Sequence, residues 1–87
     1  MNIVLYFTAE WCGPCKRTRP LVEELNKDQS ETRFYIIDVD NEIEMAQDFG
    51  IQSVPTFVVM KDNQEVYRTT GAKTKQQLEE LINYGDQ

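Results

Sequence analysis

The sequence predicts an α/β domain in which a four-stranded mixed sheet is flanked by three helices, in the order β-α-β-α-β-β-α. Two observations lead to this prediction. Short runs of β-branched and aromatic residues alternate with stretches of helical periodicity, and a polar turn separates the last two runs. The 87 residues suffice for one small domain, so residues 1–87 are expected to fold as a single unit. With 40% hydrophobic residues, the chain can build a core.

The first half of the chain is expected to form two parallel strands connected by a helix. Residues 2–8 are a short apolar run typical of a buried strand, and residues 15–28 follow with helical periodicity. Pro20 lies inside this helix and is expected to bend it. Residues 33–39 form the next strand, which the right-handed crossover rule places parallel to the first. The apolar stripe of the helix consists of Leu21, Val22 and Leu25.

A second helix is expected to begin at Asn41. Glu44 stands three residues later, so the two side chains can form a capping box. Gly50 stands where the C-terminal cap of this helix belongs. We expect the apolar face of the helix to consist of Ile43, Ala46 and Phe49.

The C-terminal part is expected to form a hairpin and a last helix. Residues 56–60 and 65–70 have strand character, and the polar turn at residues 61–64 should pair them antiparallel. Thr74 and Gln77 have the spacing of a second capping box. The core face of this helix is expected to consist of Leu78, Leu81 and Ile82, and its end is expected at Gly85.

Composition excludes several classes of function. The chain has 9 lysines and arginines against 15 aspartates and glutamates, a net charge of −6, which disfavours nucleic-acid binding. No run approaches the roughly 20 apolar residues of a membrane span. The N-terminal run lacks a basic leader and a cleavage site, so a cytoplasmic protein is expected. Without histidine, imidazole catalysis is excluded, and two cysteines cannot complete a closed zinc site, so no metal is expected.

One motif carries chemistry, Trp11-Cys12-Gly13-Pro14-Cys15, at the point where the first strand gives way to the first helix. A thiol at a helix N-terminus faces unpaired N–H groups and the positive end of the helix dipole, which favour the thiolate. We expect Cys12 to be the exposed thiol. Cys15 should be less accessible, yet close enough to form a disulfide with Cys12. Pro14 has the backbone angle of a helix start and no N–H to leave unpaired.

A disulfide between these cysteines could be structural or redox-active. A structural bridge over so short a loop would stabilise the fold by only about 2 kcal/mol, and a reducing cytosol would tend to open it. A pair that cycles between dithiol and disulfide is therefore the preferred interpretation. Lys16, Arg17 and Arg19 would stabilise a thiolate or receive an acidic partner, or they are ordinary solvated residues. Trp11 is expected to be a partly exposed contact residue.

Several segments share their residues and spacing with a known family. They are Phe7-Thr8-Ala9-Glu10-Trp11-Cys12-Gly13-Pro14-Cys15-Lys16, Pro20, Asp38-Val39-Asp40, Phe49-Gly50-Ile51, Val54-Pro55-Thr56 and Gly71-Ala72. Together they resemble the thioredoxin family, in order and over nearly the whole chain, which is far more specific than a lone Cys-x-x-Cys. The resemblance implies a thioredoxin-like fold built from the predicted strands and helices.

The resemblance also implies a role for each residue of the site. Cys12 would be the nucleophile and Cys15 the resolving thiol, with their disulfide as the redox group and no bound cofactor. Pro55 would be a cis-proline opposite the disulfide, and Val54 would offer backbone hydrogen bonds to an extended substrate segment. Substrates would dock on Trp11, Val54, Pro55, Gly71 and Ala72. The active site would be supported by Tyr6, Trp11, Gly13, Pro14 and Lys16.

The chain departs from the family pattern at its start. The family usually opens with an additional strand and helix, whereas this chain begins at the strand that leads into the motif. Residues 33–39 would then form a sheet edge, partly guarded by Arg33 and Asp38. The fold is accordingly expected to be less stable than that of longer relatives.

Two further departures are coupled. Tyr6 replaces the family's buried Asp, and Ile36 stands where the Lys that pairs with this Asp is usually found. Losing both together avoids an uncompensated buried charge. A phenol with a pKa of about 10 is a poor base, so Tyr6 would hydrogen-bond through a water or simply fill volume. Resolution by Cys15 is expected to be slower and more dependent on solvent hydroxide.

The preferred hypothesis is a monomeric protein-disulfide reductase that works by thiol–disulfide exchange. Its expected partners are disulfide-containing protein substrates and a thioredoxin reductase that draws on NADPH through a flavin. The nearest alternative is a glutaredoxin-like reductase supplied by glutathione, whose carboxylates Lys16, Arg17 and Arg19 could receive. Against it stands the single Gly71, where glutaredoxins tend to have two glycines and a following Asp.

Two alternatives belong to other classes. A thioredoxin fold can serve as a binding subunit that uses the surface around Trp11, Pro55 and Gly71 without redox turnover. A cluster or metal could also bridge two chains through Cys12 and Cys15. The compact motif favours closure of a disulfide instead.

Overall fold

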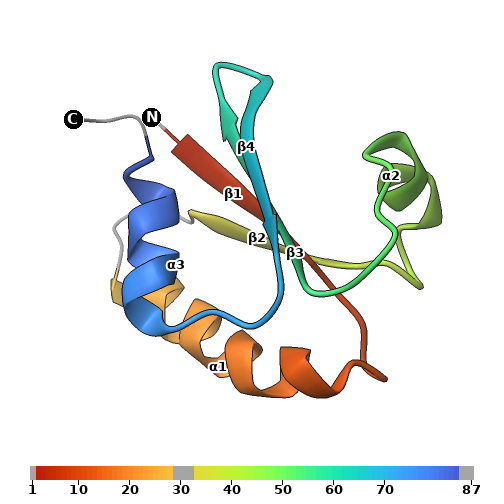
Figure 1. Ribbon diagram of the computed structural model, residues 1–87, viewed down its shortest axis with the longest axis horizontal. Helices are drawn as coiled ribbons and strands as arrows, with labels where there is room; N and C mark the ends of the chain where they lie inside the picture. The colour runs from red at the N-terminus through yellow and green to blue at the C-terminus, as the bar shows by residue number, and fades with distance from the viewer. Residues whose placement is uncertain (1, 29–32, 85–87) are drawn as a thin grey trace.

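A computed structural model describes residues 2–28 and 33–84 and confirms the predicted order of elements (Figure 1). The observed boundaries lie within two residues of the predicted ones, and the predicted helix end at Gly85 lies outside the described residues. The elements are β1 (Asn2–Thr8), α1 (Gly13–Asp28), β2 (Phe34–Asp38), α2 (Ile43–Asp48), β3 (Thr56–Lys61), β4 (Gln64–Thr70) and α3 (Lys75–Ile82).

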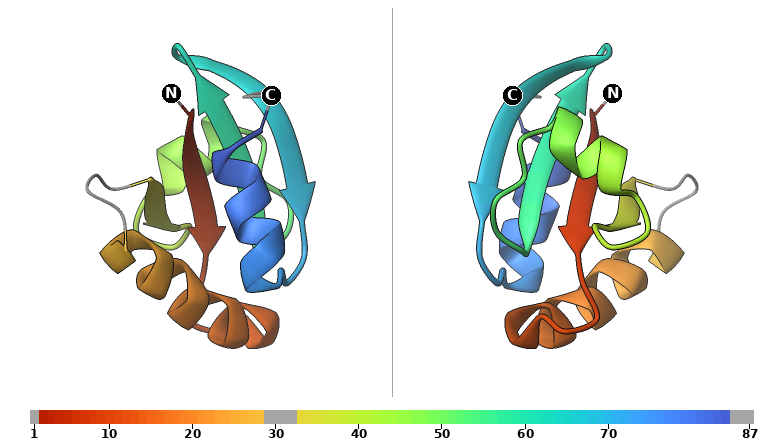
Figure 2. Two further views of the ribbon diagram at one scale, coloured as in Figure 1. Left: turned by 90° about the vertical axis from the view of Figure 1, so that its left-hand side faces the viewer. Right: turned by 90° about the vertical axis from the view of Figure 1, so that its right-hand side faces the viewer.

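The sheet is mixed, with the strand order β2-β1-β3-β4. As predicted, β1 and β2 are parallel and β3 and β4 are antiparallel. β1 also pairs antiparallel with β3, so it lies inside the sheet. Helices α1 and α3 cover one face and α2 lies against the other (Figures 1 and 2). The chain leaves the end of β1 directly for α1, which places the cysteine motif at one end of a central strand.

The core has one layer on each face of the sheet. Successive side chains of a strand point to opposite faces, so Val4 and Tyr6 pack toward α1 and α3 while Leu5 and Phe7 pack on the side of α2. The predicted apolar stripes of α1 and α3 are confirmed. Their buried members are Val22, Leu25, Leu78, Leu81 and Ile82.

The predicted capping box of α2 is wrong. This helix begins at Ile43 with Glu42 at the N-cap position, and no hydrogen bond from a described side chain caps it. The N–H groups of Asn41 and Glu42 instead donate to the carbonyl of Asp38, at 3.1 and 2.9 Å. This turn delays the start of the helix. As a result Ile43, which we expected on the apolar face, is 57% exposed, and Met45 packs against the core instead.

Left-handed backbone angles end α2 and close the hairpin. Gly50, at φ +65°, caps α2 as predicted, and the N–H of Ile51 donates to the carbonyl of Ala46 in the Schellman arrangement. Asp62 and Asn63 have φ of 54° and 67°, the angles of the type I′ turn that two-residue hairpins favour. The hairpin turn is therefore tighter than the four-residue turn that the sequence predicts.

The capping box of α3 is present as predicted. The N–H of Gln77 donates to the Thr74 hydroxyl at 3.2 Å, and the N–H of Thr74 donates to the Gln77 side chain at 2.9 Å. Both N-terminal donors are thereby satisfied. In α1, Pro20 lies within the helix, which continues beyond it to Asp28.

β2 is an edge strand, as predicted, but a residue that the sequence did not single out protects it. The Asn26 side chain of α1 donates to the carbonyl of Phe34 at 2.9 Å and accepts from the N–H of Phe34 at 3.0 Å. The Asn26 carboxamide thus satisfies both backbone groups of Phe34, which a neighbouring strand would otherwise pair. The two residues expected to guard this edge have other partners: Arg33 donates to the Asn2 carbonyl, and Asp38 accepts from the Asp40 N–H in an exposed turn.

Candidate active site

The two cysteines lie at the junction of β1 and α1. The N–H of Cys12 donates to the carbonyl of Ala9 at 3.2 Å, which closes a turn before the helix begins at Gly13. Cys12 and Cys15 are joined by a disulfide, with a Cα–Cα distance of 5.3 Å. That spacing is ordinary for a disulfide, so the first turn of the helix brings the two sulfurs together without moving the backbone.

The expectation that Cys12 is the exposed thiol is wrong for this disulfide form. Cys12 is 3% exposed and Cys15 is 2% exposed, so the chain hardly distinguishes them by burial. Both pack with Ala9 and against Val39 and Val54. The cysteines are thus covered by residues of the loops that follow β1 and β2 and precede β3, which the spacing of the motif alone does not reveal.

The sulfur of Cys12 faces a backbone donor. The N–H of Cys15 points at the Cys12 sulfur at 3.2 Å, in the first turn of α1. When the disulfide is reduced, this N–H and the helix dipole would favour a thiolate on Cys12. Gly13, Pro14 and Lys16 are exposed around it.

Tyr6 lies beneath the motif and is fully buried. Its hydroxyl donates directly to the carbonyl of Cys15 at 3.4 Å, whereas the sequence led us to expect either a hydrogen bond through a water or a side chain that only fills volume. Burial raises the pKa of Tyr6 above its ordinary value of about 10, and a hydrogen bond with Thr8 opposes this only in part. The phenol therefore remains a donor at neutral pH and cannot accept the proton of a thiol.

Beside the disulfide, Trp11 forms part of an open rim. It is 68% exposed, as predicted, and its indole N–H donates to the Asp40 carboxylate at 2.8 Å. Asp40 is itself positioned by the turn in which its N–H donates to Asp38. The sequence carries no sign of this role of Asp40, because only the folded loop brings it to Trp11.

A shallow groove adjoins the disulfide. It has a volume of about 190 Å³ and runs between Trp11 and the segment that ends in Val54. The Val54–Pro55 bond is cis, as the resemblance implied. The N–H of Gly71 donates to the carbonyl of Pro55 at 3.0 Å, so the loop after β4 is tied to the cis-proline. Of the expected docking residues, Trp11 and Val54 line the groove, whereas Pro55 is buried and Ala72 is exposed outside the lining.

A separate small opening of about 70 Å³ lies at the junction of β1 and α1. Cys15 lines it together with Glu10, Lys16 and Arg19. Arg19 pairs with Glu23 at 3.8 Å, one turn along α1. Of the cations that follow the motif, Lys16 and Arg19 thus line the approach to Cys15, and Arg19 also forms the ion pair.

Two kinds of feature are absent from the described part of the chain. Within residues 2–28 and 33–84, no group of three or more Cys, His, Asp or Glu side chains could hold a metal ion. Among the same residues, no helix is both long enough and apolar enough to cross a membrane.

Comparison with known proteins decides the family. A profile of the family described as Thioredoxin matches residues 1–84. The chain belongs to the thioredoxin family. It is 42% identical to a thioredoxin of Bacillus subtilis over 88% of this chain and 75% of the relative. It is 39% identical to an H-type thioredoxin of Fagopyrum esculentum over 91% and 68%, respectively.

Solved thioredoxin structures have the same fold. The Fasciola hepatica thioredoxin superposes with a TM-score of 0.84 at 43% identity, covering 94% of this chain and 78% of that one. NaTrxh of Nicotiana alata gives a TM-score of 0.82 at 43% identity, covering 93% and 70%. This thioredoxin is thus a thiol–disulfide oxidoreductase with protein-disulfide reductase activity, and its redox group is the Cys12–Cys15 disulfide, without a bound cofactor.

Proposed function

We propose that Cys12 is the attacking thiolate and Cys15 the resolving thiol. The observation that supports this order is the Cys15 N–H directed at the Cys12 sulfur, because a thiolate is stabilised by such a donor and by the helix N-terminus. The Cys12 side chain precedes the helix, whereas Cys15 lies inside its first turn and is therefore not in the same position at the helix N-terminus. In this proposal the two thiols differ in their electrostatic surroundings rather than in their exposure to solvent.

The reaction has two exchange steps. The Cys12 thiolate attacks one sulfur of a substrate disulfide, which forms a Cys12–substrate disulfide and releases the other substrate sulfur as a thiolate. Cys15 then loses its proton to solvent and attacks the Cys12 sulfur. This re-forms the Cys12–Cys15 bond and releases the second substrate thiolate, so two electrons pass from the protein to the substrate.

Trapping tests this assignment directly. Cys15→Ser should accumulate a mixed disulfide with a disulfide-containing protein such as insulin, detectable as an added mass. Cys12→Ser should accumulate far less, because its remaining thiol is the resolving one. Equal trapping by the two variants would reject the assigned order.

We further propose that substrates dock along Trp11, Val54, Pro55, Gly71 and Ala72. The groove between Trp11 and Val54 and the hydrogen bond from Gly71 to Pro55 support this surface. An extended segment could lie across the disulfide and hydrogen-bond to the backbone of Val54. Gly13, Pro14, Lys16 and Tyr6 would support the motif from the helix start and from below.

We propose that the 87 residues act as one monomeric domain in a reducing compartment, the cytoplasm, where a dithiol can be kept reduced. A thioredoxin reductase that draws on NADPH through a flavin would recharge it, and in that role it would carry electrons and maintain redox balance. Measuring the reduction potential of the Cys12–Cys15 pair would distinguish this thioredoxin role from a glutathione-linked role. A value near about −270 mV would support the thioredoxin role, and one about 40–70 mV higher would favour glutathione.

A further inference from the structure

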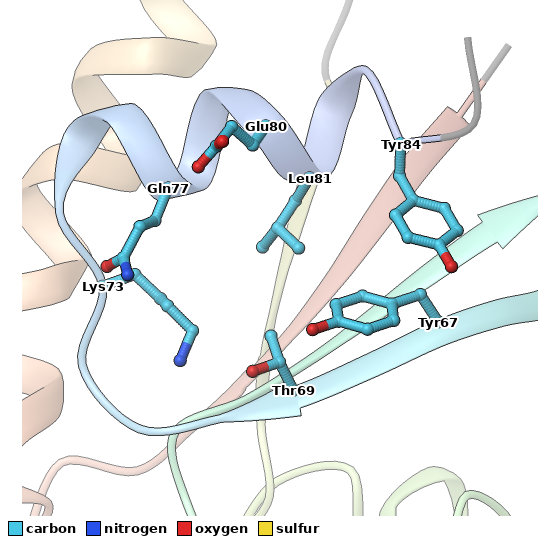
Figure 3. A pocket seen from close by; sticks show the side chains of 7 residues that line it. All are labelled: Tyr67, Thr69, Lys73, Gln77, Glu80, Leu81 and Tyr84. Carbon is cyan, nitrogen blue, oxygen red and sulfur yellow. The ribbon is translucent and has the colours of Figure 1, made fainter. Parts of the chain in front are cut away.

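A further pocket lies between β4 and α3 (Figure 3). Its volume is about 360 Å³, which falls within the range of small-molecule sites. Tyr67 and Thr69 of β4 form one side of it. These residues pair with Val59 and Phe57 of the buried strand β3, so the core fixes their positions. The pocket is therefore part of the packed fold rather than a gap between loops.

One end of the pocket is aromatic. Tyr67 and Tyr84 stack with ring centroids 4.7 Å apart, yet they remain 40% and 39% exposed. Tyr84 is anchored by its carbonyl, which accepts from the side chain of the buried Asn2 at 2.6 Å. The two rings are thus attached to β4 and β1, and they offer a preformed surface for another ring.

The other end carries hydrogen-bond donors. In Figure 3 the Lys73 ammonium and the hydroxyls of Thr69 and Tyr67 point toward the same space. The ammonium is held there by the Thr70 carbonyl, to which it donates at 2.6 Å. Among the described residues, neither hydroxyl has a hydrogen-bond partner. Gln77 accepts the Thr74 N–H with its oxygen, which leaves its amide N–H groups to donate.

The charges favour a single carboxylate at this end. Lys73 is the only described cation that lines the pocket, and a phosphoryl group of nearly two negative charges usually requires more. The carboxylate of Glu80 also lines the pocket but lies on the helix side, away from the Tyr67 hydroxyl (Figure 3). A carboxylate joined to an aromatic ring would match both ends.

We propose that this pocket is a second binding site, separate from the disulfide groove, for a carboxylate carried on an aromatic group. The ring would pack against Tyr67 and Tyr84, and the carboxylate would accept from Lys73 and the Thr69 hydroxyl. The ligand is a small aromatic acid or a peptide that presents the same two groups. The Lys73 ammonium lies 3.9 Å from where a Cβ on Gly71 would be, so the site adjoins the loop after β4.

Titration of the full chain with 3-phenylpropionate, followed by ¹H–¹⁵N NMR, tests the site. Saturable shifts are expected at amides of β4 and α3 but not at the disulfide. The uncharged 3-phenylpropanamide should bind about tenfold more weakly, the effect of one charge-assisted hydrogen bond. Lys73→Gln should cause the same loss for the acid. The matched control Lys27→Gln, in the last turn of α1, should leave the affinity unchanged.

Three results would overturn the proposal: no saturable shifts, equal binding of the acid and its amide, or equal affinities of the two lysine variants. A second titration distinguishes the sources of the ligand. Tighter binding of acetyl-Ala-Phe with a free carboxylate would point to a peptide. Exclusion of this peptide, with the small acid still bound, would point to a small molecule.

Discussion

Tyr6 and Ile36 are direct cross-strand neighbours in the parallel pair of β1 and β2. Both lie on the face covered by α1 and α3, where the Tyr6 ring stacks on Phe57 with centroids 4.8 Å apart. These are the two positions at which the resemblance leads us to expect a buried Asp and its Lys. Their adjacency explains why both changed together, since either charged group alone would be buried without a partner.

Tyr6→Asp is expected to speed the attack of Cys15 on a mixed disulfide by about tenfold or more, because a carboxylate can accept a proton that the phenol cannot. Stopped-flow measurement of mixed-disulfide resolution tests this. Tyr6→Phe is the matched control, since it removes the hydroxyl without adding a base, and its rate should stay within about twofold of the parent. An unchanged rate in Tyr6→Asp would show that no missing base limits this step.

The same variant should cost stability. Tyr6→Asp removes a buried ring and leaves a carboxylate beside Ile36, for a loss of about 3–5 kcal/mol in the free energy of unfolding. The double variant Tyr6→Asp, Ile36→Lys should recover at least about 1 kcal/mol beyond the sum of the single changes. Urea unfolding of the four proteins measures this coupling. Additive effects would mean that the two side chains do not meet.

Alkaline pH should weaken the fold through Tyr6. Because burial raises its pKa in the folded state, the unfolded chain loses the proton first as the pH rises through about 10. The free energy of unfolding should then fall by up to about 1.4 kcal/mol per pH unit until the folded-state pKa is reached. Urea midpoints measured across this pH range should fall less steeply for Tyr6→Phe. Tyr35→Phe, at a half-exposed tyrosine, should follow the parent, and identical slopes for all three would exclude Tyr6 as the cause.

Local patterns in the sequence determined most of the fold. Thr74 and Gln77 cap α3 as predicted because both partners lie within one turn, and Gly50 ends α2 because few other residues adopt its backbone angle readily. The Asn41–Glu44 pattern has the same appearance and fails. The Asp38 carbonyl takes up the N–H of Asn41, one of the two N–H groups that this box would serve, and also the N–H of Glu42. The sequence shows no sign of that competition.

The site was less accessible to prediction than the fold. The cysteine motif was evident from its residues, whereas the cis bond at Pro55 was expected only from the family resemblance. The burial of Cys12 and the contact between Trp11 and Asp40 depend on how the loop after β2 folds against the motif. Contacts across 29 residues of sequence leave no periodic pattern to detect.

Asn26 should contribute measurably to stability through the edge of the sheet. Asn26→Ala removes both hydrogen bonds to Phe34, and a loss of about 1–2 kcal/mol in the free energy of unfolding is expected. The stability of Asn26→Asp should lie between those of the parent and Asn26→Ala, because a carboxylate can accept from the Phe34 N–H but cannot donate to the Phe34 carbonyl. Asn83→Ala is the control, since that side chain makes an exposed hydrogen bond within its own helix end. Equal losses in Asn26→Ala and Asn83→Ala would contradict a special role for the edge.

Asp40 should hold Trp11 in the orientation that substrates meet. Asp40→Ala removes the acceptor of the indole N–H, worth about 1 kcal/mol at this exposed position, so the rate of insulin reduction should fall about three- to fivefold. Trp11 is the only tryptophan, so its fluorescence anisotropy reports the released ring directly and should decrease. Asp48→Ala makes the same change in charge at the exposed end of α2 and should alter neither quantity. If both variants slowed reduction equally, the effect would come from net charge, and the hydrogen bond between Trp11 and Asp40 would have no part in docking.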